Sequence, residues 1–112
     1  MKYYHNPRCR KSREGLSILE ERGLLPEIVL YLKDNPSKSE IIDVISKLGV
    51  HPLDLVRKSE KIYNEKYKNY SLNEGQLIDM LVENPILIER PIFINEDKGV
   101  IGRPPEKVLE II

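Results

Sequence analysis

Residues 2–13 read KYYHNPRCRKSR and contain the only cysteine of the chain, Cys9. The tyrosine-rich start, from Lys2 to His5, predicts a short strand, and Asn6-Pro7 predicts a turn. From about Arg10 to Arg22, apolar residues recur at helical spacing before a glycine that ends the helix. Cys9 is therefore expected at the junction between a strand and a helix.

The sequence that follows extends this beginning into a strand–helix–strand unit. Ile28 to Leu32 is a continuous apolar run, which is consistent with a buried strand. A helix that connects two neighbouring strands in this way nearly always makes a right-handed crossover between parallel strands. We therefore expect a parallel pair at the N-terminal side of a sheet.

The middle of the chain, about residues 37–84, is predicted to be a helical insertion. Ser37 and Glu40 have the spacing of a capping box, and Ser71 and Glu74 repeat that spacing. Each pair precedes a run of apolar residues at helical spacing, which indicates a helix that buries one face. Two amphipathic helices are thus expected in this segment.

The last third returns to a strand pattern. Pro91 to Ile94 and Val100-Ile101 flank the polar segment 95–99, which predicts an antiparallel hairpin. Pro104-Pro105-Glu106 then starts a final helix. The whole order predicts a single α/β domain over residues 1–112, with a mixed four-stranded sheet and a thioredoxin-like fold.

Composition excludes several classes of protein. The chain has 112 residues with 18 basic and 18 acidic side chains, so its net charge of zero argues against a global nucleic-acid-binding surface. A hydrophobic fraction of 40% with 32% charged residues is typical of an ordinary globular protein. No signal peptide or membrane span is expected, and we predict a cytoplasmic monomer.

The single cysteine limits the chemistry that the chain can perform alone. Cys9 can form neither an intramolecular disulfide nor a multi-cysteine metal site, so no metal is expected. Four cations surround it in the sequence, and the start of a helix also favours a thiolate. Those cations are Arg8, Arg10, Lys11 and Arg13. We favour a reactive thiol, although a small apolar residue at a turn is the alternative.

Two polar residues near Cys9 are candidates for tuning the thiol. Cys9 and Ser12 have the C-x-x-C spacing with serine in place of the second cysteine, so Ser12 can donate a hydrogen bond but cannot resolve a disulfide. Alternatively, Ser12 bonds the backbone in the first turn of the helix. His5 could tune the thiol or be a surface or packing residue.

Three distant arginines lie at predicted element boundaries: Arg57, Arg90 and Arg103. Their guanidinium groups suit tetrahedral oxyanions, although each one alone could be a solvated surface charge. Pro91 follows Arg90, and only about 5–6% of X-Pro bonds in folded proteins are cis. Without further information the sequence favours a trans bond there.

Four separated motifs, in the same order along residues 3–112, resemble the glutaredoxin-coupled arsenate reductase family. They are Tyr4-His5-Asn6-Pro7-Arg8-Cys9 with Ser12-Arg13, Leu55-Val56-Arg57-Lys58, the segment 84–92, and Ile101-Gly102-Arg103-Pro104-Pro105-Glu106. The resemblance implies a thioredoxin-like fold with a helical insertion, in agreement with the pattern of strands and helices.

The resemblance also implies a reaction. Cys9 would be the nucleophile that attacks arsenate, and Arg57, Arg90 and Arg103 would bind the oxyanion. Glutathione would act as a co-substrate that supplies the second thiol, and glutaredoxin would clear the resulting mixed disulfide. No bound cofactor is expected.

The same motifs imply roles around the thiol. His5 would help to tune Cys9, and Ser12 and Arg13, which belong to the same motif, are predicted to contribute. Pro91 would be the cis-proline that thioredoxin-like folds place beside the active cysteine. The resemblance thus reverses the expectation of a trans bond at this position.

Two alternatives stay open at this point. The better-known members of the family carry small residues after the cysteine, where this chain has Arg10 and Lys11. The protein could therefore be a monothiol oxidoreductase for another oxyanion or for glutathionylated substrates. A less favoured reading is an Spx-like regulator that binds RNA polymerase, because those regulators carry C-x-x-C where this chain has Ser12.

Overall fold

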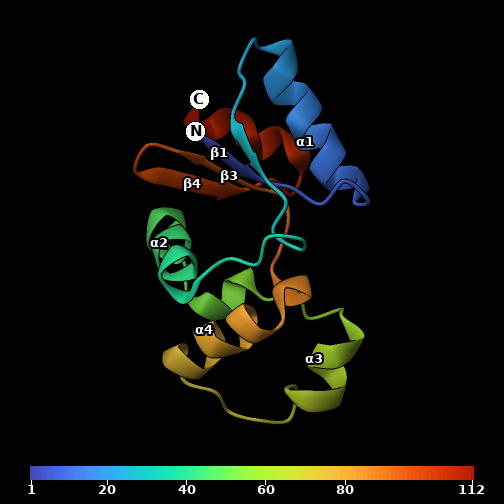
Figure 1. Cartoon of the computed structure of the whole chain (residues 1–112), viewed down its shortest axis with the longest axis vertical. Coiled ribbons are helices and arrows are strands. Elements are labelled where there is room, and N and C mark those ends of the chain that lie inside the picture. Colours follow the sequence, from blue (N-terminus) through green and yellow to red (C-terminus); the bar gives the residue numbers. More distant parts are fainter. The chain divides into compact units, whose positions relative to one another are not determined.

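The structure, a computed structural model, describes all 112 residues, which form two compact units. The first unit combines residues 1–34 with residues 90–112, and the second consists of residues 35–89. The helical insertion predicted over residues 37–84 lies within the second unit. The sheet and the only cysteine belong to the first unit (Figure 1).

The first unit is built on a four-stranded mixed sheet with the strand order β2-β1-β3-β4. Its strands are β1 (Lys2–Tyr4), β2 (Glu27–Val29), β3 (Ile92–Asn95) and β4 (Lys98–Ile101). Strand β1 pairs in parallel with β2 and antiparallel to β3, and β3 pairs antiparallel to β4. The predicted mixed sheet with one parallel pair is therefore confirmed.

Two helical elements complete the first unit. They are α1 (Arg10–Glu21) and the 3₁₀ helix η3 (Pro105–Ile111), which lie side by side (Figure 1). Both pack on the sheet through fully buried side chains, where each large apolar group contributes about 1.5–3 kcal/mol. The centre of this core consists of Tyr3, Leu19, Phe93 and Val108. The final helix predicted from Pro104 is thus a 3₁₀ helix.

Strand β2 differs from the prediction of a buried strand over Ile28 to Leu32. It ends at Val29, and Ile28 is 41% exposed because β2 lies at the edge of the sheet. The chain then turns, with the N–H groups of Lys33 and Asp34 both bonded to the carbonyl of Leu30. An apolar run indicates a strand, but it does not distinguish an edge strand from a central one.

The hairpin is tighter than the sequence predicted. Strand β4 begins at Lys98 and includes Gly99, whereas we expected the second strand to begin at Val100. Only Glu96 and Asp97 connect the strands, and Glu96 adopts a φ of 57°, the left-handed conformation that such short turns need. The absence of glycine at that position concealed the short turn in the sequence.

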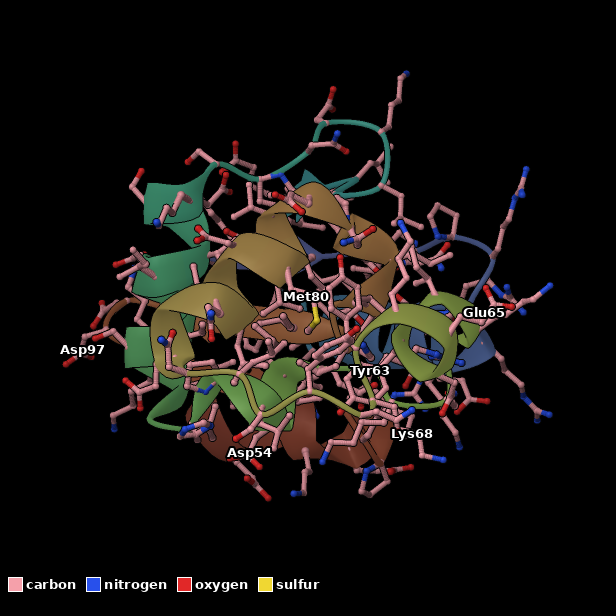
Figure 2. The ribbon with its side chains drawn as sticks, turned by 90° about the horizontal axis from the view of Figure 1, so that it is seen from below. Asp54, Tyr63, Glu65, Lys68, Met80 and Asp97 are labelled. Carbon is pink, nitrogen blue, oxygen red and sulfur yellow. The ribbon has the colours of Figure 1, made fainter.

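The second unit is helical. Its elements are α2 (Lys38–Leu48), η1 (Pro52–Leu55), α3 (Lys61–Lys66), α4 (Glu74–Glu83) and η2 (Pro85–Leu87). Helix α4 contacts α2, η1 and η2, and Figure 2 shows the Met80 sulfur of α4 enclosed by other side chains. None of the helices in the chain combines the length and apolar character that a membrane span requires.

The start of α4 also differs from the prediction. The capping box is formed by Asn73 and Gln76, two residues after the predicted pair Ser71 and Glu74. Asn73 Oδ1 accepts from the Gln76 N–H at 2.8 Å, and Gln76 Oε1 accepts from the Asn73 N–H at 2.9 Å. Asparagine and glutamine serve these positions as well as serine and glutamate, so the sequence contains two overlapping matches.

Candidate active site

Cys9 is the residue that precedes the first turn of α1. Its backbone is extended, with φ −92° and ψ 121°. The Cys9 N–H donates to the carbonyl of Asn6 at 2.9 Å, and its carbonyl accepts from the N–H of Arg13 at 3.1 Å. The first turn of α1 carries no acidic residue, so nothing offsets the positive end of the helix dipole. The thiol is half-buried and therefore reachable from solvent.

Two arginines from the other end of the chain reach the thiol. Arg103 Nη2 lies 3.6 Å from Cys9 Sγ, and Arg103 Nε donates to the carbonyl of Arg90 at 2.7 Å. The Arg90 side chain is buried and also hydrogen bonds Cys9. Both arginines therefore contact the sulfur of Cys9. The side chain of Arg103 is fixed by its hydrogen bond to the backbone of Arg90.

The register of the sheet explains how these arginines arrive there. Tyr4 at the end of β1 pairs with Ile92 at the start of β3, and Ile92 pairs with Ile101 at the end of β4. Arg90 therefore lies just before the start of β3, and Arg103 lies just after the end of β4. Both positions are at the same end of the strands as the loop that leads from β1 to Cys9. The pairing of β1, β3 and β4 thus brings residues that are far apart in the sequence close to Cys9.

These groups determine the charge state of Cys9. Burial raises the pKa of the thiol, but the backbone N–H of Ser12 and the charges of Arg90 and Arg103 more than offset this effect. The pKa of Cys9 therefore lies below that of an ordinary cysteine. Because the thiolate is the nucleophilic form, the site provides an attacking sulfur at a lower pH than an ordinary cysteine would.

The buried hydroxyl of Ser12 contacts two groups of the segment before α1. Its buried Oγ accepts from the Asn6 N–H at 3.0 Å and lies 2.7 Å from His5 Nδ1. Burial lowers the pKa of His5, and the charge of Arg13 lowers it further. These two contacts fix the loop before α1, and the role of the Ser12 hydroxyl in tuning Cys9 stays a prediction.

The cations next to Cys9 in the sequence face other partners. Arg10 Nε lies 2.7 Å from Glu14 Oε1 with its side chain 84% exposed. Arg13 Nη1 donates to the carbonyl of Pro7 at 2.8 Å, which holds the loop from outside. The structure thus brings Cys9, His5 and Ser12 together, and it places Arg13 behind the loop.

Arg57 belongs to the second unit. It follows η1, its N–H donates to the Leu87 carbonyl at 2.7 Å, and its Nε lies 3.1 Å from Glu60 Oε1. The backbone of this segment is therefore fixed, and its guanidinium is paired with a carboxylate. The role of Arg57 as a third oxyanion-binding arginine stays a prediction.

The peptide bond between Arg90 and Pro91 is cis, and so is the bond between Arg103 and Pro104, which no sequence pattern singled out. Gly102 lies against Pro91, since a Cβ at Gly102 would lie only 2.8 Å from Pro91 Cγ. The Gly102 N–H also donates to the Pro91 carbonyl at 2.9 Å. This close contact fixes the backbone between the two site arginines.

Sequence reasoning missed Tyr3 as part of the site. Its hydroxyl donates to the carbonyl of Ser12 at 2.6 Å within the core. Helix α1 makes room for it with Gly15, where a Cβ would lie 2.5 Å from Tyr3 Oη. A glycine in the middle of an otherwise regular helix was the available signal.

The arrangement offers an activated sulfur beside two guanidinium groups. Guanidinium forks bind tetrahedral oxyanions through paired N–H donors, and they neutralise charge that develops when a nucleophile attacks. No three His, Cys, Asp or Glu side chains are grouped so that they could hold a metal ion. A thiolate beside two guanidinium groups is an arrangement that suits nucleophilic attack on an anionic substrate.

Comparisons with known proteins agree with this geometry. The ArsC family model matches residues 4–111. The chain is 46% identical to YfgD, an uncharacterized protein of Escherichia coli (strain K12), over 100% of this chain and 96% of the relative. It is also 46% identical to an arsenate reductase of Haemophilus influenzae, over 97% and 96% of the two chains.

Solved structures show the same likeness. The arsenate reductase from Vibrio cholerae has a TM-score of 0.94 with this chain at 39% identity, and the alignment covers 100% of this chain and 98% of that one. The predicted α/β fold of the thioredoxin-like class is thereby confirmed.

Proposed function

Because the chain belongs to the ArsC family, we propose that it is an oxidoreductase that reduces arsenate through Cys9. The observation that carries this proposal is the contact of Arg103 and Arg90 with a thiol of lowered pKa. A cationic site next to a thiolate attracts the arsenate anion and then neutralises the charge that develops during attack. Arg57 would add a third guanidinium.

The first step forms a bond between sulfur and arsenic. The Cys9 thiolate attacks As(V), and one arsenate oxygen leaves as water after protonation. A glutathione thiolate then attacks the Cys9 sulfur. The electron pair of the sulfur–arsenic bond passes to arsenic, which leaves as As(III), and Cys9 and glutathione are left as a mixed disulfide.

The second half of the cycle restores the thiol. A glutaredoxin thiolate attacks the glutathione sulfur of the mixed disulfide, and Cys9 leaves as a thiolate. The lowered pKa of Cys9 makes it a good leaving group in this step. External thiols are required because the chain has one cysteine. Free thiols of this kind belong to a reducing compartment, so we expect the protein to work in the cytoplasm. We also expect it to be a monomer.

A coupled assay tests the proposal. Arsenate-dependent oxidation of NADPH is measured with glutathione, glutaredoxin and glutathione reductase. We expect turnover with the native chain and a loss of at least about a thousandfold in Cys9→Ser, since removal of a nucleophile eliminates the covalent route. Circular dichroism of both proteins controls for folding. Equal activity of the two proteins would refute the proposal.

The same assay separates a second candidate. A model mixed disulfide of glutathione replaces arsenate as substrate. The half-buried thiolate at a C-x-x-S motif would suit such a disulfide as well. Turnover of the disulfide without turnover of arsenate would assign the chain as a monothiol oxidoreductase for glutathionylated substrates.

A further inference from the structure

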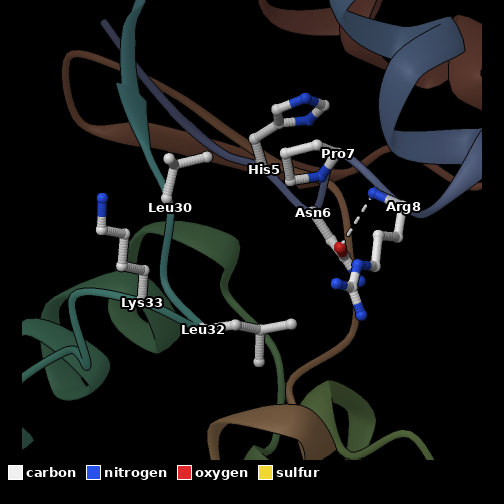
Figure 3. A pocket seen from close by; sticks show the side chains of 7 residues that line it. All are labelled: His5, Asn6, Pro7, Arg8, Leu30, Leu32 and Lys33. Carbon is white, nitrogen blue, oxygen red and sulfur yellow. Dashed lines mark hydrogen bonds between the residues drawn. The ribbon is translucent and has the colours of Figure 1, made fainter.

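A pocket opens beside the loop that leads to Cys9. It lies within the first unit, where the chain leaves the parallel strands β1 and β2, and its volume is about 340 Å³. Ligands of α/β proteins commonly bind outside the carboxyl ends of parallel strands. Seven residues from two segments line it (Figure 3): His5, Asn6, Pro7, Arg8, Leu30, Leu32 and Lys33.

The wall of this pocket is mainly apolar. Pro7 contributes its ring from the loop after β1, and Leu30 and Leu32 contribute their side chains from the segment after β2. Leu32 is 42% exposed. An exposed apolar wall of this kind gains free energy when a ligand with an apolar surface covers it.

Two cations stand at the pocket on opposite sides. Figure 3 shows Lys33 beside Leu30 and Arg8 across the pocket from both. Both side chains are exposed, and neither lies within ion-pair distance of a carboxylate. The pocket is therefore suited to a ligand with an apolar middle and a negative charge at each end.

We propose that this pocket binds glutathione, the peptide thiol that supplies the second sulfur of the reaction. Its two carboxylates pair with Arg8 and Lys33, and its cysteinyl part lies along the leucine wall. The volume is at the lower end of the roughly 300–1,000 Å³ range of small-molecule sites, which suits a tripeptide. The inference rests on the proposed function.

Arg8 connects the pocket with the candidate active site, because it lines the pocket and precedes Cys9 in the chain. Consecutive Cα atoms are about 3.8 Å apart, and an extended tripeptide spans roughly 10 Å. A tripeptide held by Arg8 is therefore bound next to the loop that carries Cys9. The residues that lower the pKa of Cys9 are Ser12, Arg90 and Arg103, so the pocket and the activation of the thiol use different groups.

Binding is tested on Cys9→Ser with S-methylglutathione, a probe that cannot form a disulfide. We expect amide NMR shifts concentrated at residues 5, 6, 8 and 30–33. We also expect the Kd to rise about tenfold in Lys33→Glu, which turns an attraction into a repulsion. The matched control is Lys98→Glu, an exposed lysine of β4 that does not line the pocket. It is expected to leave the Kd unchanged.

Inorganic phosphate is the second probe, because any anion could occupy two cations. Phosphate is expected to bind more weakly than S-methylglutathione at residues 30–33. Equal affinity for phosphate, equal effects of the two lysine variants, or shifts confined to other residues would each overturn the proposal.

Kinetics separate this proposal from the proposed function. In the coupled assay Lys33→Glu is expected to raise the KM for glutathione several-fold and to leave the KM for arsenate unchanged. Arsenate turnover with an unaltered glutathione KM would refute glutathione binding in this pocket and leave the proposed function intact. Binding at residues 30–33 in a protein without arsenate turnover would refute the function and support the pocket.

Discussion

Two groups of cations can be compared around Cys9: those that adjoin it in residues 8–13 and those at the ends of the β3–β4 hairpin. The adjoining group is denser in charge, yet Arg10 faces Glu14 and Arg13 faces the Pro7 carbonyl. The hairpin group is up to 94 residues away in the sequence, yet Arg103 lies 3.6 Å from the sulfur. The number of charged residues near Cys9 in the sequence therefore does not tell which charges act on the thiol.

Helix and sheet geometry explain the difference. In the first turn of α1 the face toward the core is occupied by Ser12, which is fully buried, so the cations on either side must point to solvent. Arg90 is different, because it emerges directly before a buried strand and is itself only 8% exposed. A buried arginine is held in place by its surroundings, whereas an exposed one is free to move.

The largest expected effect comes from removing one member of each group. Arg103→Ala should lower kcat/KM for arsenate by about 10²–10³, the usual cost of losing a donor that stabilises developing charge. Arg10→Ala should change it by less than about twofold, because this side chain is 84% exposed and pairs with Glu14. The coupled assay measures both variants under the same conditions.

The opposite ranking would break the comparison. If Arg10→Ala cost as much as Arg103→Ala, Arg10 would act on arsenate despite its exposure and its pairing with Glu14. Thermal unfolding of both variants controls for a general loss of structure, since Arg103 also donates to the Arg90 carbonyl at 2.7 Å. Arg103→Lys sharpens the result, because it keeps the charge but not the fork.

A smaller effect is expected on the ionisation of Cys9. The rate of thiol alkylation follows the thiolate fraction, which rises with pH through the pKa. In the native chain the midpoint should lie below that of an ordinary cysteine, because the pKa of Cys9 is lowered. Arg103→Ala removes one cause of that lowering, so the midpoint should move to higher pH, whereas Arg10→Ala should leave it in place.

These profiles measure the thiol without any substrate. A midpoint of the native chain at the value of a free cysteine would contradict an activated thiol. Equal midpoints in all three proteins would show that Arg103 acts on the substrate alone. The Cys9→Ser chain controls for alkylation at other side chains.

Much of the first unit could be predicted because its signals are local. Apolar runs, the turn at Asn6-Pro7 and the glycine after α1 predict β1, α1 and the hairpin from neighbouring residues alone. The shifted capping box at Asn73 and the edge position of β2 were not predictable in the same way. In both cases the local sequence is compatible with two arrangements, and tertiary packing decides which of them forms.

In the candidate site, too, some features follow from the local sequence and others depend on the tertiary structure. Cys9 was identified from its position and its neighbours, but the partner of each cation depends on where its side chain points. Arg90 and Arg103 stood out by their positions at predicted element boundaries, and the family resemblance implied their role. Their contact with the sulfur follows from the register of three strands. The carbonyl acceptor for Tyr3 lies nine residues away on another element, which no periodic pattern indicates.

The smallest expected effect concerns the hydrogen bond that joins Tyr3 to the first turn of α1. Tyr3→Phe removes the hydrogen bond to the Ser12 carbonyl and should lower the free energy of unfolding by about 1 kcal/mol. Tyr70→Phe, at a tyrosine that is 70% exposed, should leave stability unchanged. Urea denaturation measures both variants. Because the N–H of Ser12 favours the thiolate, Tyr3→Phe should also raise the alkylation midpoint of Cys9, and a lower stability with an unmoved midpoint would limit Tyr3 to packing.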